Sequence, residues 1–220
     1  MTTKRPPGTI SQGLLIAVVV LTLVVLGLGA ATVALQLRSD EPPTSAAERD
    51  IAIWNARIHE NPSAWAYTGL GLAHLKAGDE TKAGKAFHEA LELDPNDWMA
   101  LFQLGLLDRD TDPDGAIDYL YRSADAAPRS RAFAPLVAVG ELLLARGDAS
   151  GAKAAFERAV SDFPFDFNSH FGLGQALEQL GDDAGALEQY RRALDFNPDS
   201  EEALDAIERL GGSPTTTEGS

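Results

Sequence analysis

The stretch GDDAGALEQYRRALDFNPD, residues 181–199, decides the fold because nearly the same sequence pattern occurs at two earlier places. Residues 78–96 read GDETKAGKAFHEALELDPN, and residues 147–165 read GDASGAKAAFERAVSDFPF. Each stretch has Gly-Asp, then Ala, an aromatic residue, a second Ala and Pro at the same distances. Three copies of one spacing indicate an internal repeat, which has to be identified before any other feature is interpreted.

Proline, glycine and alanine extend this periodicity over most of the chain, because each recurs at intervals of 33–36 residues. The recurring positions are Pro62, Pro95, Pro128, Pro164 and Pro198, then Gly71, Gly105, Gly140 and Gly174, then Ala83, Ala116, Ala152 and Ala186. Their spacing resembles the tetratricopeptide repeat (TPR), a 34-residue helix-turn-helix unit. The resemblance covers residues 64–200 and implies four repeats.

Individual residues match the repeat motif in most of the units. The Leu-Gly pair of the family is matched by Leu70-Gly71, Leu104-Gly105, Val139-Gly140 and Leu173-Gly174. The sequence Ala, aromatic, Ala, Pro of the second helix is matched by Ala83, Phe87, Ala90 and Pro95, by Ala152, Phe156, Ala159 and Pro164, and by Ala186, Tyr190, Ala193 and Pro198. The second unit departs from this pattern, since Leu120 replaces the aromatic residue and Ser123 replaces the second Ala.

The small and turn-forming residues have physical reasons to stand where they do. Gly71 and its equivalents allow close packing within a unit, beside large residues such as Phe87. Gly78, Gly147 and Gly181 suit the left-handed residue that ends a helix, the Asp after each can cap the next helix, and the later Pro stops it. The resemblance therefore predicts an all-α TPR solenoid with repeats over about 64–97, 98–130, 133–166 and 167–200.

Two flanking segments complete the expected solenoid, which spans residues 50–211. Residues 50–62 read as a lone second helix with Trp54 in the aromatic position, and residues 201–211 read as a capping helix with Leu204, Ile207 and Leu210 facing inward. A cap is needed because the last unit of an open stack would otherwise expose an apolar face. Residues 212–220 are too polar to fold.

An apolar segment near the N-terminus predicts a membrane anchor. No charged residue occurs from Pro6 to Leu37, and Leu14–Leu35 would form a helix about 33 Å long at about 1.5 Å per residue, enough for a hydrocarbon core of about 30 Å. We expect a transmembrane helix over 13–37, after a cytoplasmic segment 1–12. The alternative is a cleaved signal peptide, although its apolar region is typically only about 7–15 residues.

The charges around this segment predict its orientation. Lys4 and Arg5 precede it, so the positive-inside rule places the N-terminus in the cytoplasm and the solenoid outside it. A linker over 38–49 follows, in which Ser45 and Glu48 form a capping-box pattern that predicts a helix start near Ala46.

Composition argues against several classes of function. The net charge is −15, and −17 from residue 38 onward, which would repel the phosphate backbone of a nucleic acid. There is no cysteine, and therefore no thiolate nucleophile or zinc-thiolate site. His170 replaces a repeat aromatic, so we expect it to pack, and the stretch DRDTDPDG over 108–115 lacks the Glu of a calcium loop and reads as a turn. We therefore expect no catalysis, no metal and no cofactor.

The resemblance also implies a binding surface, because the first helices of successive repeats line a concave groove in this family. Carried over by position, that surface is formed by Trp65, Thr68, Leu72, Leu75, Met99, Phe102, Leu106, Arg109, Ala134, Val137, Glu141, Leu144, Asn168, Phe171, Gln175 and Glu178. We expect a peptide to contact Trp65, Thr68, Leu72, Leu75, Met99, Phe102, Leu106, Val137, Glu141, Phe171 and Gln175.

The groove residues restrict the kind of ligand. The Lys and Asn with which some TPR proteins hold a terminal carboxylate are missing at the matching positions. Because the N-terminal half of the groove is apolar, an apolar peptide or an amphipathic helix is the expected ligand. Alternatively, the helix at 50–62 or the linker covers Trp65 and Phe102.

These features predict a non-catalytic, membrane-anchored scaffold that binds a protein or peptide outside the cytoplasm. One anchor followed by four repeats also resembles the accessory subunits of bacterial cytochrome c maturation, which implies a chaperone-like role in presenting apocytochrome for haem ligation. A structural, self-associating subunit of an envelope complex is a further alternative.

Overall fold

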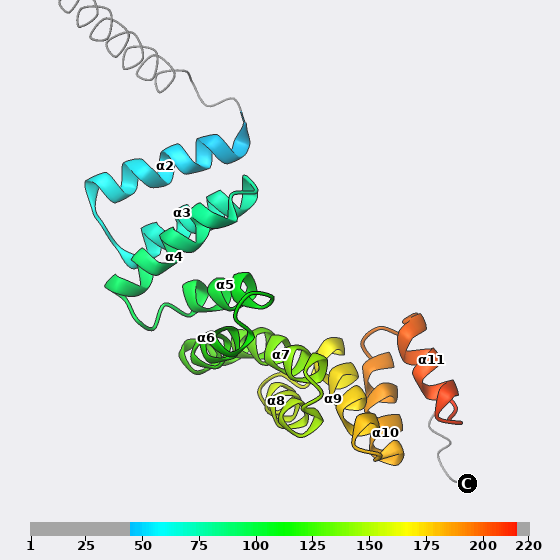
Figure 1. The fold of residues 1–220 in the computed structure, drawn as a ribbon. Coiled ribbons are helices and arrows are strands. Elements are labelled where there is room, and N and C mark those ends of the chain that lie inside the picture. Colours follow the sequence, from blue (N-terminus) through cyan, green and yellow to red (C-terminus); the bar gives the residue numbers. More distant parts are fainter. Residues whose placement is uncertain (1–44, 215–220) are drawn as a thin grey trace, which may run out of the picture. The chain divides into compact units, whose positions relative to one another are not determined.

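The computed structural model describes residues 45–214, which form α-helices joined by short turns and contain no strand. The helices, labelled in Figure 1, are α2 (Ala46–Glu60), α3 (Ala64–Lys76), α4 (Glu80–Leu93), α5 (Trp98–Asp108), α6 (Pro113–Ala126), α7 (Arg129–Ala145), α8 (Ala149–Asp162), α9 (Phe167–Gln179), α10 (Asp183–Leu194) and α11 (Glu201–Arg209). The predicted transmembrane helix over 13–37 lies outside the described residues. Among residues 45–214, no helix combines the length and apolar composition needed to cross a bilayer.

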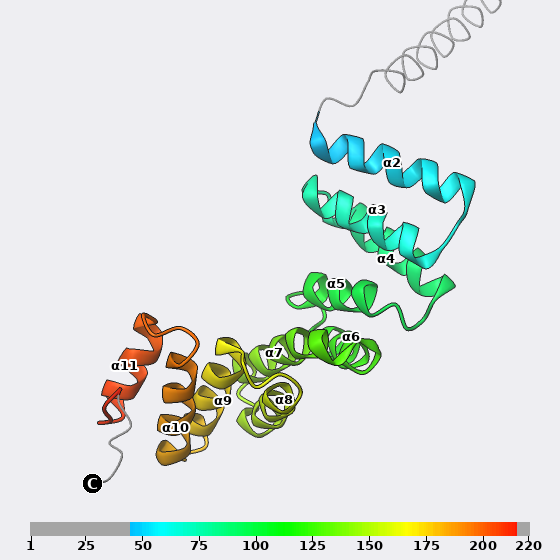
Figure 2. The ribbon, with the colours of Figure 1, turned by 180° about the vertical axis from the view of Figure 1, so that it is seen from behind.

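Eight of the helices form four hairpins. The most extensive helix–helix contacts join α3 to α4, α5 to α6, α7 to α8 and α9 to α10. Successive hairpins stack in chain order, with α2 beside α3 at one end and α11 beside α10 at the other, as Figures 1 and 2 show. The predicted all-α solenoid of four helical hairpins with flanking helices is therefore confirmed.

The Gly-Asp pairs build the turns inside the repeats as predicted. Gly78 has a φ of 77° and donates its N–H to the Leu75 carbonyl, while the N–H of Asp79 reaches the His74 carbonyl. These two bonds form the Schellman arrangement that ends α3. The Asp79 carboxylate then accepts from the Lys82 N–H at 3.1 Å and caps α4. The same turns recur at Gly147-Asp148 and Gly181-Asp182.

In three of the four repeats, the glycine of the first helix makes room for an aromatic ring. A Cβ added at Gly71 would lie 2.4 Å from the ring of Phe87, which is fully buried. The ring of Phe156 is held from two sides, because a Cβ at Gly140 would lie 2.5 Å from it and one at Gly172 of the next repeat 2.3 Å from it. One side chain thus joins the third repeat to the fourth.

The second repeat keeps this packing with different residues. Leu120 fills the place of the ring, and a Cβ at Gly105 would lie 2.6 Å from its Cγ. Ser123 is fully buried, and its hydroxyl donates to the Trp98 carbonyl at 2.7 Å, which satisfies the polar group that replaces Ala. The turn over 108–115 ends in a helix cap, because Asp112 accepts from the Gly115 N–H at 3.1 Å.

The start of α2 confirms the capping-box prediction of a helix start near Ala46, whereas α7 begins earlier than the sequence indicated. The capping box between Ser45 and Glu48 forms, with both bonds at 3.0 Å, so residues 46–49 belong to α2 rather than to the linker. Helix α7 begins at Arg129, four residues before the expected start of the third repeat at 133. The interval of 36 residues between Pro128 and Pro164 is longer than the others, and the extra residues extend this helix. Helix α11 ends at Arg209, with the left-handed Gly211 after it.

The terminal helices close the stack in different ways. Trp54 of α2 packs on Gly69, where a Cβ would lie 2.5 Å from the ring, as Phe156 packs on Gly172. Helix α2 therefore occupies the place of a second helix, although none of its residues is fully buried. Helix α11 buries Ile207, and Leu204 and Leu210 pack partly against the same core, as predicted.

Candidate peptide-binding groove

We call the exposed and cavity-lining residues of the first helices α3, α5, α7 and α9, together with those of α11, the groove face. A cavity of about 650 Å³ lies on it between α5 and α7. This α5–α7 cavity is lined by Trp98, Met99, Phe102, Gln103, Ser130, Arg131, Phe133 and Ala134. Its size is within the range of sites that hold small ligands or the side chains of a partner.

The walls of the α5–α7 cavity are mainly apolar and include three aromatic residues, with a cation at one side. Trp98, Met99, Phe102 and Phe133 are all half-buried, so part of each remains accessible. The guanidinium of Arg131 lies 5.8 Å from the centroid of the Trp98 ring, within the range of a cation–π contact. The cavity therefore suits an apolar or aromatic group rather than a strongly hydrated one.

The C-terminal half of the groove face is polar. Two further cavities, of about 450 and about 650 Å³, lie between α7, α9 and α11, and both are lined by Glu141 and Gln175. We call them the α7–α9–α11 cavities; their other lining residues include Leu144, Phe167, Asn168, Phe171, Glu178, Glu202 and Arg209.

Glu178 forms a hydrogen-bonded network that ties α9 to α10 and α11. Arg209 donates two bonds to its carboxylate, at 3.0 and 2.8 Å, and the Tyr190 hydroxyl donates a third at 2.7 Å. The bonds from Arg209, more than any other interaction, lower the pKa of Glu178, and partial burial opposes them. Burial, followed by the bond to Glu178, raises the pKa of Tyr190. The carboxylate of Glu178 and the guanidinium of Arg209 are thus already paired with each other.

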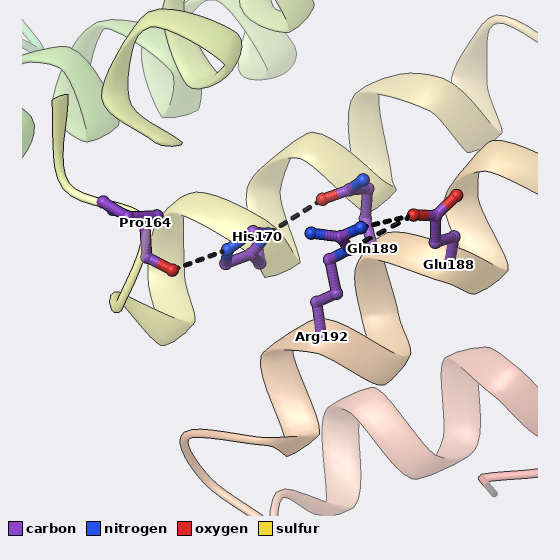
Figure 3. A network of polar contacts seen from close by, with 5 residues as sticks. All are labelled: Pro164, His170, Glu188, Gln189 and Arg192. Atoms are coloured by element: carbon purple, nitrogen blue, oxygen red, sulfur yellow. Dashed lines mark hydrogen bonds and ion pairs between the residues drawn. The ribbon is translucent and has the colours of Figure 1, made fainter. Parts of the chain in front are cut away.

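His170 has the packing role predicted for it. It is almost fully buried, its ring stacks on Phe196 with centroids 5.7 Å apart, and it contacts two oxygens. Nδ1 lies 2.8 Å from Oε1 of Gln189, and Nε2 lies 3.1 Å from the Pro164 carbonyl oxygen (Figure 3). The same figure shows Arg192 paired with Glu188 beside the amide. His170 therefore links the turn before α9 to α10.

The structure brings several of the predicted groove residues together. Met99 and Phe102 line the α5–α7 cavity, while Glu141, Phe171 and Gln175 line the α7–α9–α11 cavities. Ala134, Leu144, Asn168 and Glu178, which were placed on the same surface by position, also line these cavities.

The predicted residues of α3 divide into exposed and buried ones. Trp65 and Leu72 are 61% and 38% exposed. Thr68 was expected on the surface but is buried, because its hydroxyl donates at 2.7 Å to Asp97, whose carboxylate caps α5. Thr68 therefore holds one first helix to the start of the next and is not available to a ligand.

Three other predicted residues contribute mainly to packing. Leu75 packs against the core around Phe87, and Val137 packs against the clusters around Phe156 and Leu136. Leu106 is half-buried on α5. Leu75 and Val137 are less accessible than expected because they pack against core residues that include those of the second helices.

The proposed covering of the groove by α2 is found only in part. The Trp65 ring packs edge-on against Trp54, with centroids 4.8 Å apart, and Arg57 lies 5.1 Å from both rings. Trp65 nevertheless stays largely exposed, and Phe102 lines the α5–α7 cavity. Helix α2 therefore does not close this cavity; linker residues 38–44 lie outside the described residues.

Sequence reasoning missed part of the α5–α7 cavity. The early turns of α7 contribute Ser130, Arg131 and Phe133 to the lining. Ser130 and Arg131 precede residue 133, where the third repeat was expected to begin, and Phe133 is the first residue of that expected repeat. The signal that could have located them is the longer proline interval before Pro164. Trp98 was missed because it stands at the first position of its helix.

Comparisons with known proteins agree with this architecture. Family models for the tetratricopeptide repeat match residues 64–97 and residues 138–201. No curated protein sequence matches the chain. Together with the four helical hairpins, these matches identify tetratricopeptide repeats in this protein.

Solved structures with the same fold include PilF from Pseudomonas aeruginosa, which superposes with a TM-score of 0.66 at 18% identity over 84% of this chain and 80% of that one. YrrB, described as a TPR protein with an unusual peptide-binding site, has a TM-score of 0.60 at 22% identity over 74% of this chain and 84% of its own. MamA has a TM-score of 0.60 at 19% identity over 70% of this chain and 96% of its own. At these identities the likeness shows a shared fold.

Proposed function

We propose that this protein is a non-catalytic interaction scaffold that binds a peptide or an amphipathic helix of a partner on its groove face. TPR folds are typical of protein–protein interaction scaffolds, and YrrB is an example with a peptide-binding site. The observation that carries the proposal is the α5–α7 cavity, where accessible aromatic side chains surround a space of about 650 Å³. Accessible aromatic residues that line a groove are typical of sites for the anchor residues of a partner.

The location of this scaffold is part of the proposal. The apolar segment over 13–37 would anchor the chain in a membrane, with its N-terminus in the cytoplasm and the solenoid outside. An anchor raises the effective concentration of the scaffold toward partners in or near the same membrane.

Replacing Phe102 by Glu tests the groove. We expect Phe102→Glu to weaken binding of a partner captured from native membranes at least about tenfold, because a carboxylate in the cavity would have to lose its hydration beside apolar walls. The measurement is affinity capture with the full-length chain in detergent, followed by quantification of each captured protein.

Two controls make the result interpretable. Lys85→Glu changes a charge on the exposed face of α4 and should leave capture unchanged. Because Phe102 also packs partly against the core around Leu120, helix content is compared by circular dichroism, and Met99→Lys provides a second substitution in the same cavity. If Phe102→Glu and Met99→Lys, both folded, capture the same proteins as the unmodified chain, the groove is not the binding site.

The two alternative functions stay predictions from domain architecture. A role in cytochrome c maturation would gain support if the captured partner were a haem-protein precursor or a haem-ligation enzyme. A self-associating structural role would instead predict that the captured protein is a second copy of this chain.

A further inference from the structure

Two oppositely charged residues of α7 line different cavities of the groove face. Arg131 lines the α5–α7 cavity, and Glu141 lines both α7–α9–α11 cavities. Within the described part of the chain, neither side chain forms a hydrogen bond or a salt bridge, and the Arg131 guanidinium has only its contact with the Trp98 ring. Each charge is therefore open to an occupant of its cavity.

The surroundings reinforce this difference in charge. No acidic side chain lines the α5–α7 cavity, where Arg131 is the one charged lining residue. Around Glu141, by contrast, the cavities are also lined by Glu178 and Glu202, and the cation there, Arg209, already donates two bonds to Glu178. The α5–α7 cavity is thus apolar and cationic, whereas the α7–α9–α11 cavities are acidic.

We propose that the groove selects a partner segment of matching polarity and holds it in one direction. The segment carries a large apolar residue with an adjacent Asp or Glu at the α5–α7 cavity, and a Lys or Arg at the α7–α9–α11 end. The proposal rests on the peptide-binding function above. A segment bound in the reverse direction would place a basic residue beside Arg131 and an acidic residue beside Glu141. Repulsion between these like charges would strongly disfavour the reverse direction.

The helix also sets the spacing of the two charges in the partner. Arg131 and Glu141 are ten residues apart on α7, which corresponds to about 15 Å along its axis. An extended segment rises about 3.3 Å per residue, so its acidic and basic residues should stand about 4–6 positions apart. A helical segment would need a separation of about 10 positions.

Selection from a random peptide library displayed on phage tests both the polarity and the spacing. The baits are the full-length chain in detergent and its variants Arg131→Glu and Glu141→Lys, with Lys85→Glu and Glu89→Lys on the exposed face of α4 as matched charge reversals. We expect the unmodified chain and both α4 variants to enrich peptides with an acidic residue beside an aromatic or large aliphatic one and a basic residue at one of the two spacings.

The α7 variants should change the selected charges separately. Arg131→Glu should replace the acidic residue of the selected peptides by a basic one, and Glu141→Lys should replace the basic residue by an acidic one. Peptides selected by the original chain should bind each α7 variant at least about tenfold more weakly.

The outcomes distinguish this inference from the proposed function. If the enriched peptides are lost with a Phe102→Glu bait but show no fixed order of charges, the groove binds peptides and the inference of polarity is wrong. If the α7 variants select the same peptides as the unmodified chain, the inference is also wrong. If no bait enriches any peptide, both the inference and the peptide-binding function fail.

Discussion

Replacing Phe156 by Ala is expected to destabilise the protein by about 3–5 kcal/mol, the usual cost of truncating a fully buried Phe. The expected loss is large because this ring fills the space against Gly140 in its own repeat and against Gly172 in the next. Its removal leaves a cavity at the junction of two repeats, and neighbouring helices can collapse into it only in part. Urea unfolding of the full-length chain, followed by circular dichroism, measures the change.

Phe165 provides the matched control. It lies in the turn between α8 and α9, two residues before α9, but 69% of its surface is exposed. Phe165→Ala should therefore change the free energy of unfolding by no more than about 0.5 kcal/mol. Equal effects of the two substitutions would contradict the packing described for the third and fourth repeats.

Replacing Gly140 by Ala and replacing Gly84 by Ala should change the free energy of unfolding in opposite directions. Gly140→Ala should destabilise by about 1–3 kcal/mol, because the new Cβ would lie 2.5 Å from the buried ring of Phe156. Gly84→Ala, in the middle of α4, should stabilise by about 0.5–1 kcal/mol, because the nearest atom to its Cβ is a Leu107 methyl at 3.9 Å and Ala favours helix. The same urea titration compares them.

A double substitution separates a clash with the ring from other causes. In a Phe156→Ala background the ring is absent, so Gly140→Ala should no longer destabilise and should gain part of the helix-propensity benefit. If Gly140→Ala costs the same stability with and without the ring, the glycine is required for some other reason and the assigned contact is wrong.

The sequence predicted the fold because the signals that define it are local and repeated. Each Gly-Asp turn is specified by the two residues that form it, as Gly78 and Asp79 show. Where one repeat departs from the motif, the other repeats still define its alignment. The second repeat could be aligned despite its departures, since Leu120 and Ser123 occupy the expected places.

The groove was less predictable because accessibility depends on neighbours that are distant in sequence. Thr68 stands at a surface position of its own helix, yet its hydroxyl donates a hydrogen bond to Asp97, which lies 29 residues later in the sequence. Arg131 was missed because the boundary of α7 depends on two additional residues in one repeat, and periodicity locates boundaries poorly where the period changes. Positions copied from a regular repeat therefore located Phe102 and Glu141 but not the whole lining.

The most direct test of the central claim, that the groove face is the binding surface, is photo-crosslinking from single sites. A benzophenone amino acid is placed at Met99 in the α5–α7 cavity or at Lys85 on the exposed face of α4, in the full-length chain in its native cells. We predict a discrete crosslinked partner from position 99 that disappears when Phe102→Glu is combined with it, and no such product from position 85. A partner crosslinked from position 85 and not from position 99 would contradict the account.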